Sequence, residues 1–316
     1  MNRRLTNEPM NEQTINRDPT AETGVVINCV VQSADILGEV PRWCERTQKL
    51  WWVDVRRPAL QCWEPTTGEY TARRLHPDLV TGSMVLRKGG GFLLATASGI
   101  YLEDSGGRQA AMRIAHPEEG KPGMRMNDGK CDRRGRFWVG SMHDTVREPT
   151  GTLYRIDADH GYTPMLQDFV LPNALSWSPD DSTMYFADTH NQMMWAFDYD
   201  IDAGEISNRR IFRDWTYQAG RPDGATVDAE GFIWVCMVAT GHLVRLAPDG
   251  RIDRTIQLPV TNPTCPAFGG ADYRTLYITS HSQRFTPEQQ AREPLAGALL
   301  SLDVGVRGLP EPCFAG

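Results

Sequence analysis

The stretch FWVGSM, residues 137–142, is a short and mainly apolar run of the kind that forms a buried β-strand. A polar segment with a glycine, DRRGR at residues 132–136, stands directly before it and is typical of a tight chain reversal. Together they predict the second strand of a β-hairpin. The cluster occurs six times, the other copies being LWWVDV from Leu50, FLLATA from Phe92, MYFADT from Met184, IWVCMV from Ile233 and LYITS from Leu276.

The spacing of these copies identifies the repeat. Successive copies begin 42 to 49 residues apart, which matches the blade period of β-propellers, about 40 to 50 residues, and not the shorter leucine-rich or helical repeats. A second alternating run follows each copy and predicts a third strand, whereas the fourth strands have no clear pattern. Helical periodicity is weak, and TPEQQAREP near Thr286 is the one plausible short helix. The sequence therefore predicts an all-β fold, a six-bladed β-propeller.

Composition fits a globular chain with a packed interior. Of the 316 residues, 40% are hydrophobic and 23% are charged. Residues 1–24 are polar and lack periodicity, so we expect a flexible N-terminal segment there. Residues 25–316 are predicted to form a single catalytic propeller domain.

Charge and hydropathy exclude several classes of partner. A net charge of −7 and no Lys/Arg-rich run argue against nucleic acid. A membrane span needs about 18 uninterrupted apolar residues, and neither that nor a signal peptide is found, so we expect a cytoplasmic protein. The seven cysteines are scattered without a CxxC pair, which suits buried packing residues in a reducing compartment. The sequence does not indicate an oligomeric state.

The position about ten residues before each cluster, where the innermost strand of a blade would begin, is Glu, Asn or Asp in four of the six copies. That strand lines the central channel of a propeller, so the residues at its start are expected to surround one end of the axis. Carboxylate and amide oxygens suit a hard divalent cation, although an Asn or Asp at such a place can also simply form a turn. The six positions are Glu39, Gly82, Asn127, Asn173, Asp223 and Cys265.

Arg125 lies two residues before Asn127, on the same side of an extended segment. Its guanidinium would stand beside the same site and could hold substrate hydroxyls or a carboxylate. An isolated surface arginine is the alternative reading.

Four motifs, in order and at blade spacing, resemble the senescence marker protein/gluconolactonase family, also called regucalcin-like. They are GEVPRW around Glu39, RMNDGKCDRRGRFWVGSM from Arg125, PNALSWSPDDSTMYFADT from Pro172 and RPDGATVDAEGFIWV from Arg221. The resemblance extends over nearly the whole chain from about Asp35.

The resemblance implies one divalent metal ion, whether Ca, Zn, Mn, Mg or Fe, bound by Glu39, Asn173 and Asp223. It also implies that Arg125 and Asn127 contact the substrate and that Asp223 serves as general base. The expected reaction is hydrolysis of a sugar-acid lactone, such as glucono-, arabinono- or galactonolactone, to the open-chain acid.

Two alternatives stay open: a calcium-binding regulatory propeller without catalysis, and a metal-dependent arylesterase or phosphotriesterase. The chain also departs from the family at residues 141–144, which read SMHD where acidic residues that touch the substrate often stand. His143 either serves specificity or caps a loop. The segment 143–150 is either part of a lid or an ordinary surface loop.

Overall fold

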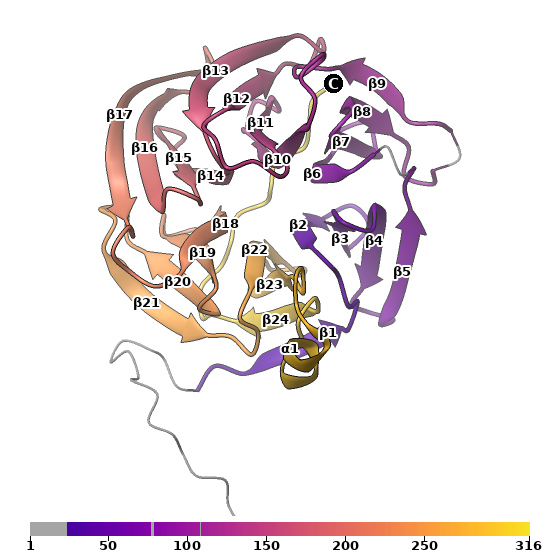
Figure 1. Ribbon diagram of the computed structural model, residues 1–316, viewed down its shortest axis with the longest axis vertical. Coiled ribbons are helices and arrows are strands. Elements are labelled where there is room, and N and C mark those ends of the chain that lie inside the picture. The colour runs from indigo at the N-terminus through magenta and orange to yellow at the C-terminus, as the bar shows by residue number, and fades with distance from the viewer. Residues whose placement is uncertain (1–23, 77–78, 108) are drawn as a thin grey trace, which may run out of the picture.

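Six small antiparallel sheets surround one axis in the computed structural model, which describes residues 24–76, 79–107 and 109–316 (Figure 1). Each sheet has four strands, so the predicted six-bladed β-propeller is confirmed. The expected flexible segment 1–24 lies, except for Gly24, outside the described residues. None of the helices in the described ranges is long and apolar enough to span a bilayer.

The blades are numbered in chain order, and each begins with its innermost strand. Blade I contains β2 (Gly38–Cys44), β3 (Lys49–Asp54), β4 (Ala59–Glu64) and β5 (Glu69–Arg74); blade II contains β6 (Thr81–Leu86), β7 (Phe92–Thr96), β8 (Gly99–Glu103) and β9 (Met112–Ala115). Blade III contains β10 (Met124–Cys131), β11 (Phe137–His143), β12 (Gly151–Ile156) and β13 (Tyr162–Phe169); blade IV contains β14 (Pro172–Trp177), β15 (Thr183–Asp188), β16 (Met193–Asp200) and β17 (Glu205–Asp214). Blade V contains β18 (Arg221–Val227), β19 (Ile233–Val238), β20 (His242–Leu246) and β21 (Ile252–Gln257); blade VI contains β22 (Pro263–Gly269), β23 (Thr275–Ser280), β24 (Leu299–Asp303) and β1 (Ile27–Val31).

The repeated cluster forms the second strand of every blade, as predicted: β3, β7, β11, β15, β19 and β23. The expected short helix is also present, as α1 (Pro287–Arg292). Thr286 caps its N-terminus by accepting a hydrogen bond from the backbone N of Gln289, whose side chain bonds back to Thr286 N.

Blade VI is completed by the N-terminal end of the described chain. β1 pairs antiparallel with β24, so that Ile27 lies opposite Leu302 and Cys29 opposite Leu300. The first strand of the propeller is thus the outermost strand of its last blade (Figure 1). This pairing closes the ring.

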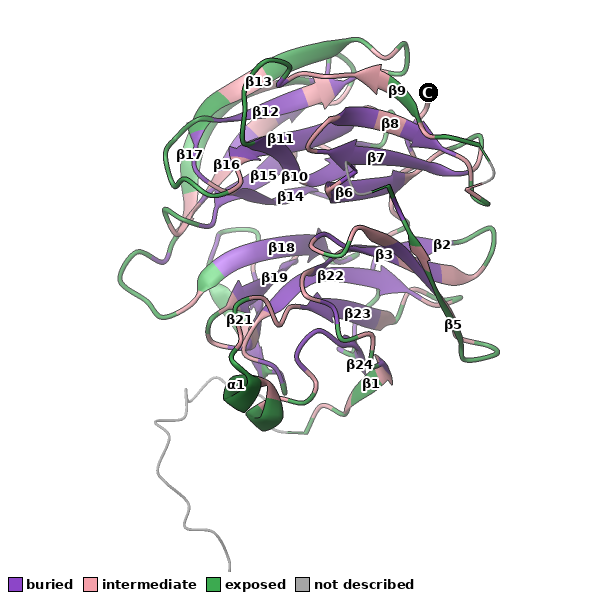
Figure 2. Ribbon diagram, turned by 45° about the vertical axis from the view of Figure 1, so that its right-hand side comes forward, coloured by how far each residue is buried: buried purple, intermediate pink, exposed green. Residues whose placement is uncertain are grey.

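Burial decreases from the axis outward (Figure 2). All residues of β7 and β14 are buried, whereas no residue of the fourth strand β5 is. The apolar clusters lie between neighbouring blades, as with Phe169, Phe186 and Trp138 between blades III and IV. Sheet-on-sheet packing around the ring therefore supplies the core.

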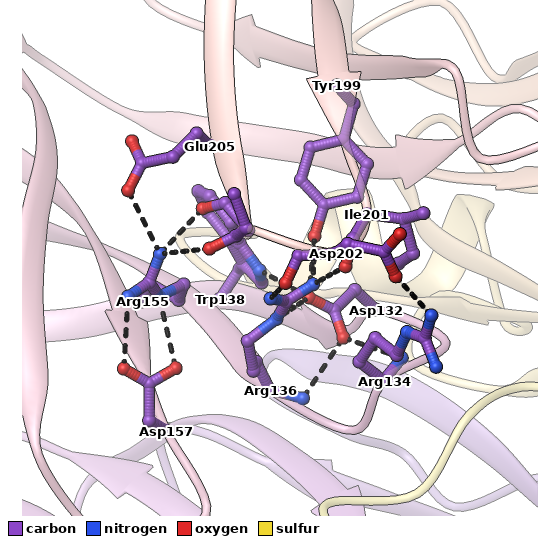
Figure 3. A network of polar contacts seen from close by, with 12 residues as sticks. Asp132, Arg134, Arg136, Trp138, Arg155, Asp157, Tyr199, Ile201, Asp202 and Glu205 are labelled. Atoms are coloured by element: carbon purple, nitrogen blue, oxygen red, sulfur yellow. Dashed lines mark hydrogen bonds and ion pairs between the residues drawn. The ribbon is translucent and has the colours of Figure 1, made fainter.

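Buried carboxylates also hold the hairpins of the blades in place. Asp132 accepts hydrogen bonds from Trp138 Nε1 at 3.1 Å, Arg136 Nε at 2.6 Å and Tyr199 OH of blade IV at 2.6 Å (Figure 3). Its second oxygen accepts from the backbone N of Arg134 and Arg136 in the β10–β11 turn. One carboxylate thus fixes a turn, an indole and the neighbouring blade.

The C-terminal segment, residues 304–316, crosses the propeller end at which the innermost strands finish (Figure 1). It bonds to four turns between first and second strands, through Gly308 N to Tyr273 O, Ala229 N to Arg307 O, Phe314 N to Leu86 O and Ala315 N to Gly135 O. The strands begin at the opposite end of the channel, which is therefore the end left open to a substrate.

We expect Asp132→Ala to destabilise the fold by about 3–5 kcal/mol, because it leaves the half-buried Arg136 guanidinium without its carboxylate partner and the buried Trp138 indole and Tyr199 hydroxyl without their acceptor. The measurement is the free energy of unfolding in urea. Asp202→Ala is the control, since among the described residues the Asp202 side chain pairs only with the exposed Arg134, and it should change stability by no more than about 0.5 kcal/mol. Equal effects of the two substitutions would contradict this role of Asp132.

Candidate functional site

Every innermost strand has an irregularity at the same level of the channel. Register shifts occur between Glu39 and Arg42, Thr81 and Ser83, Met126 and Gly129, Asn173 and Ser176, Pro222 and Ala225, and Pro263 and Pro266. A β-bulge redirects the side chains that it contains, and bulges are frequent next to active sites. The six positions singled out in the sequence lie inside these irregularities or at their edge.

Two of these bulges hold residues in the left-handed region of backbone space. Val40, directly after Glu39, has φ of 47°, and Ala174, directly after Asn173, has φ of 55°. This conformation is a steric outlier for a β-branched residue, and such strain gathers at functional sites where the surrounding packing enforces it. Val40 and Ala174 are both buried in the apolar clusters between blades. The packing therefore fixes how Glu39 and Asn173 leave the backbone.

A chain of hydrogen bonds joins blades III, IV and V at this end. Arg125 Nη1 donates to Asn127 Oδ1 at 2.7 Å, and Asn127 Nδ2 donates to Asn173 Oδ1 at 2.9 Å. Asn173 Nδ2 donates to Thr189 Oγ1 at 2.7 Å, and that hydroxyl donates to the carbonyl of Pro222 at 2.6 Å. Pro222 directly precedes Asp223. The structure thus brings together three of the five predicted site residues, Arg125, Asn127 and Asn173, along one polar chain that ends at the residue before Asp223.

The fifth, Glu39 on blade I, joins them through electrostatics. Burial raises the pKa of the Glu39 carboxyl well above its usual range, and the nearby charges of Asp223 and Asp128 raise it further. Burial and Asp128 likewise raise the pKa of Asp223, while Arg125 lowers both. Among the described residues nothing donates a hydrogen bond to the Asp223 carboxylate, and Glu39 accepts one only from Val40 N, at 3.3 Å. A half-buried carboxylate, Glu39, and a buried one, Asp223, therefore interact with little compensation.

These side chains fit a hard divalent cation. Two carboxylates with unfilled acceptor sites and the Asn173 amide oxygen form an oxygen donor set, which such ions prefer. Within the described ranges no three His, Cys, Asp or Glu side chains converge on one point, so an amide oxygen has to complete the set. Burial raises the pKa of the neighbouring thiols Cys236 and Cys265 well above the usual value, which keeps them protonated and unsuited to binding a metal ion.

Asp144 holds Arg125 in place, a role that the sequence did not reveal. Arg56 donates to both Asp144 oxygens, at 2.7 and 2.8 Å, and Arg125 Nε donates to one of them at 2.6 Å. Partial burial would raise the pKa of Asp144, but the two arginines hold it well below its usual range. No local motif signals this contact, because Arg56 comes from the β3–β4 turn of blade I.

His143 caps the loop that follows β11. Its Nδ1 accepts hydrogen bonds from Val146 N at 3.0 Å and from Thr145 N at 3.3 Å. Of its two expected roles, the structure shows loop capping. A cavity of about 560 Å³ lies beside Arg125. Its lining includes Arg56, Arg125, Asp144, His116, Glu118 and residues 120–124. Of the segment 143–150, only Asp144 lines this cavity.

Comparison with known proteins identifies the family of the chain. The family model described as SMP-30/Gluconolactonase/LRE-like region matches residues 37–282. A 6-deoxy-6-sulfogluconolactonase from Pseudomonas putida is 39% identical over 291 residues, which cover 92% of this chain and 99% of that protein. A regucalcin from Xenopus laevis is 33% identical, covering 93% and 100%. The crystal structure of a calcium-binding protein, regucalcin, from Agrobacterium tumefaciens superimposes with a TM-score of 0.88 at 27% identity, covering 92% and 98%. The chain therefore belongs to the SMP-30/gluconolactonase/LRE-like family.

Proposed function

We propose that the protein hydrolyses the lactone of a sugar acid to the open-chain acid, with one divalent cation held by Glu39, Asn173 and Asp223. The observation that carries the proposal is the pair of poorly compensated carboxylates, half-buried Glu39 and buried Asp223, at the starts of two innermost strands. The polar chain from Arg125 through Asn127 to Asn173 runs beside that pair. The substrate class is supported by the relative from Pseudomonas putida, which is named a sugar lactonase and matches almost end to end.

Hydrolysis adds water to the lactone carbonyl carbon and breaks its bond to the ring oxygen, which leaves as a hydroxyl group. A bound divalent cation supplies a Lewis acid that stabilises the negative charge developing on the carbonyl oxygen. Asp223 accepts a proton from the attacking water and returns it to the departing ring oxygen. Burial and the Asp128 charge raise the pKa of Asp223 in the cation-free site, and a bound cation would lower it again.

Arg125 and Asn127 orient the substrate in this proposal. Asn127 sits between Arg125 and Asn173 and presents its amide to the same space. Asp144 and Arg56 fix the Arg125 guanidinium before a substrate arrives, so less conformational entropy is lost on binding. Correct placement of the ring hydroxyls then exposes one face of the carbonyl to water.

Cation binding without catalysis is the second candidate, favoured by the Agrobacterium tumefaciens relative, which is described as a calcium-binding protein. The same carboxylates would serve both functions, so only turnover separates them. An arylesterase or phosphotriesterase activity is less well supported, because guanidinium and amide donors suit a hydroxyl-rich ligand better than an aryl ring. A panel of aldonolactones and aryl esters, assayed after chelation and re-addition of single metals, tests all three functions.

Asp223→Ala should lower kcat/KM for the preferred aldonolactone by at least about 100-fold, because the variant lacks the proposed base and one cation ligand. The circular dichroism spectrum of the variant should match that of the wild type, since the Asp223 side chain has no structural hydrogen bond among the described residues. Asp249→Ala, an exposed carboxylate of the same blade paired with Arg251, is the matched control. Near-wild-type turnover in Asp223→Ala would exclude the mechanism.

Asp223→Asn should raise the melting temperature of the chelated protein at neutral pH, by about 2 °C or more. The folded-state pKa of Asp223 is raised above its unfolded value, so the ionised carboxylate costs stability above the unfolded pKa and this cost disappears in acid. Differential scanning fluorimetry measures the melting temperature of each protein in chelator and with added divalent cation. The variant should also lose most of the stabilisation that the cation gives to the wild type. A lower melting temperature than wild type in chelator would contradict an unbalanced charge at Asp223.

A further inference from the structure

Two buried, positively charged side chains, Arg42 and Lys130, lie in the channel below the candidate site. Arg42 on β2 is 2% exposed, and Lys130 on β10 is 7% exposed. Arg42 Nη2 donates to Gly129 O at 2.8 Å, and Lys130 Nζ donates to Ala225 O of blade V at 3.0 Å. Backbone carbonyls alone do not compensate a buried positive charge, so each cation requires an anion nearby.

Glu311 of the C-terminal segment supplies that anion. Its Oε2 lies 3.2 Å from Arg42 Nη1, and its Oε1 lies 2.8 Å from Lys130 Nζ. Burial alone would raise the pKa of Glu311, but the two cations lower it below its usual value. Glu311 is therefore ionised at neutral pH and bridges blades I and III from the closed end of the channel.

Asp128 connects this ion cluster to the proposed cation ligands. Burial raises the pKa of Asp128 above its usual value, although the charges of Arg42 and Lys130 act to lower it. Asp128 accepts a hydrogen bond at 3.2 Å from the backbone N of Leu175, two residues after Asn173, and Lys130 reaches the carbonyl of Ala225, two residues after Asp223. The cluster of Arg42, Lys130, Asp128 and Glu311 carries two positive and two negative charges. Without Glu311 the space beneath the candidate site would carry a net charge of +1.

We propose that Glu311 is a positioning residue for the cation site: its charge neutralises Arg42 and Lys130, so that Glu39 and Asp223 face a divalent cation without a competing positive charge below them. This inference rests on the proposed function, because it concerns the affinity of the same site for its cation. Charges buried in a protein are screened less than charges in water, so the net charge of the cluster acts on a cation bound in the same channel.

The anchoring of the C-terminal segment does not depend on the Glu311 charge. Phe314 is fully buried between blades II and III, and its backbone bonds to Leu86 O and Lys88 N. Gly308 N bonds to Tyr273 O on the other side of the cluster. The charge can therefore be removed while both anchors stay in place.

The test measures binding of Ca²⁺ and Mn²⁺ to the chelated full-length protein by isothermal titration calorimetry at one pH. Glu311→Gln should weaken the affinity about ten-fold, since it leaves one positive charge uncompensated. Arg42→Met should strengthen the affinity, and the double variant, which restores neutrality, should return within about three-fold of the wild type. Glu288→Gln, on the exposed surface of α1, is the control and should not change the affinity.

A purely structural Glu311 would give a different pattern. Glu311→Gln would then lower the melting temperature while the cation affinity stayed at the wild-type value, and this result overturns the proposal. Failure of the double variant to recover affinity overturns it as well, because the charge balance would not be the cause. A wild-type protein that binds no divalent cation would reject the proposed function together with this inference, whereas equal affinities of wild type and Glu311→Gln reject the inference alone.

Discussion

The close approach of six innermost strands around one axis is the constraint on which this structure depends. At Gly82 an added Cβ would lie 1.9 Å from the carbonyl oxygen of Met126, and at Gly224 it would lie 2.6 Å from the sulfur of Cys265. Strands that meet so closely leave no room for regular pairing with ordinary side chains along their whole length. All six bulge at the same level, and the bulges turn polar side chains from different blades toward one space.

Burial then determines the chemistry of that space. Glu39, Asp223 and Asp128 are three carboxylates in a channel walled by apolar sheets, an arrangement that costs folding free energy when they are ionised. The strained backbone at Val40 adds to this cost. The packing between blades and buried anchors such as Asp132 offset both. The packing of the sheets supplies the stability of the fold, whereas the site contains charged groups that lower stability but can bind a cation and a substrate.

The sequence predicted those parts of the structure that depend on local pattern. The buried second strands repeat at blade spacing, and the polar starts of the first strands keep register with them, so both could be found. The fourth strands could not, because a strand such as β5, with no buried residue, has no apolar alternation. The pairing of Arg56 with Asp144 and the insertion of Glu311 between Arg42 and Lys130 depend on contacts between distant segments, for which one sequence carries no signal.

The closure of blade VI has a consequence for biosynthesis. β1 is the first described strand to be synthesised, and its partner β24 is the last. Ile27 therefore cannot pair with Leu302 until the rest of the propeller has been synthesised. Until then the β24 edge does not exist and the β1 edge is unpaired, which exposes the nascent chain to wrong partners. Native contacts of such sequence separation make folding slow. The ring of blades therefore closes only after β24 has been synthesised and can pair with β1.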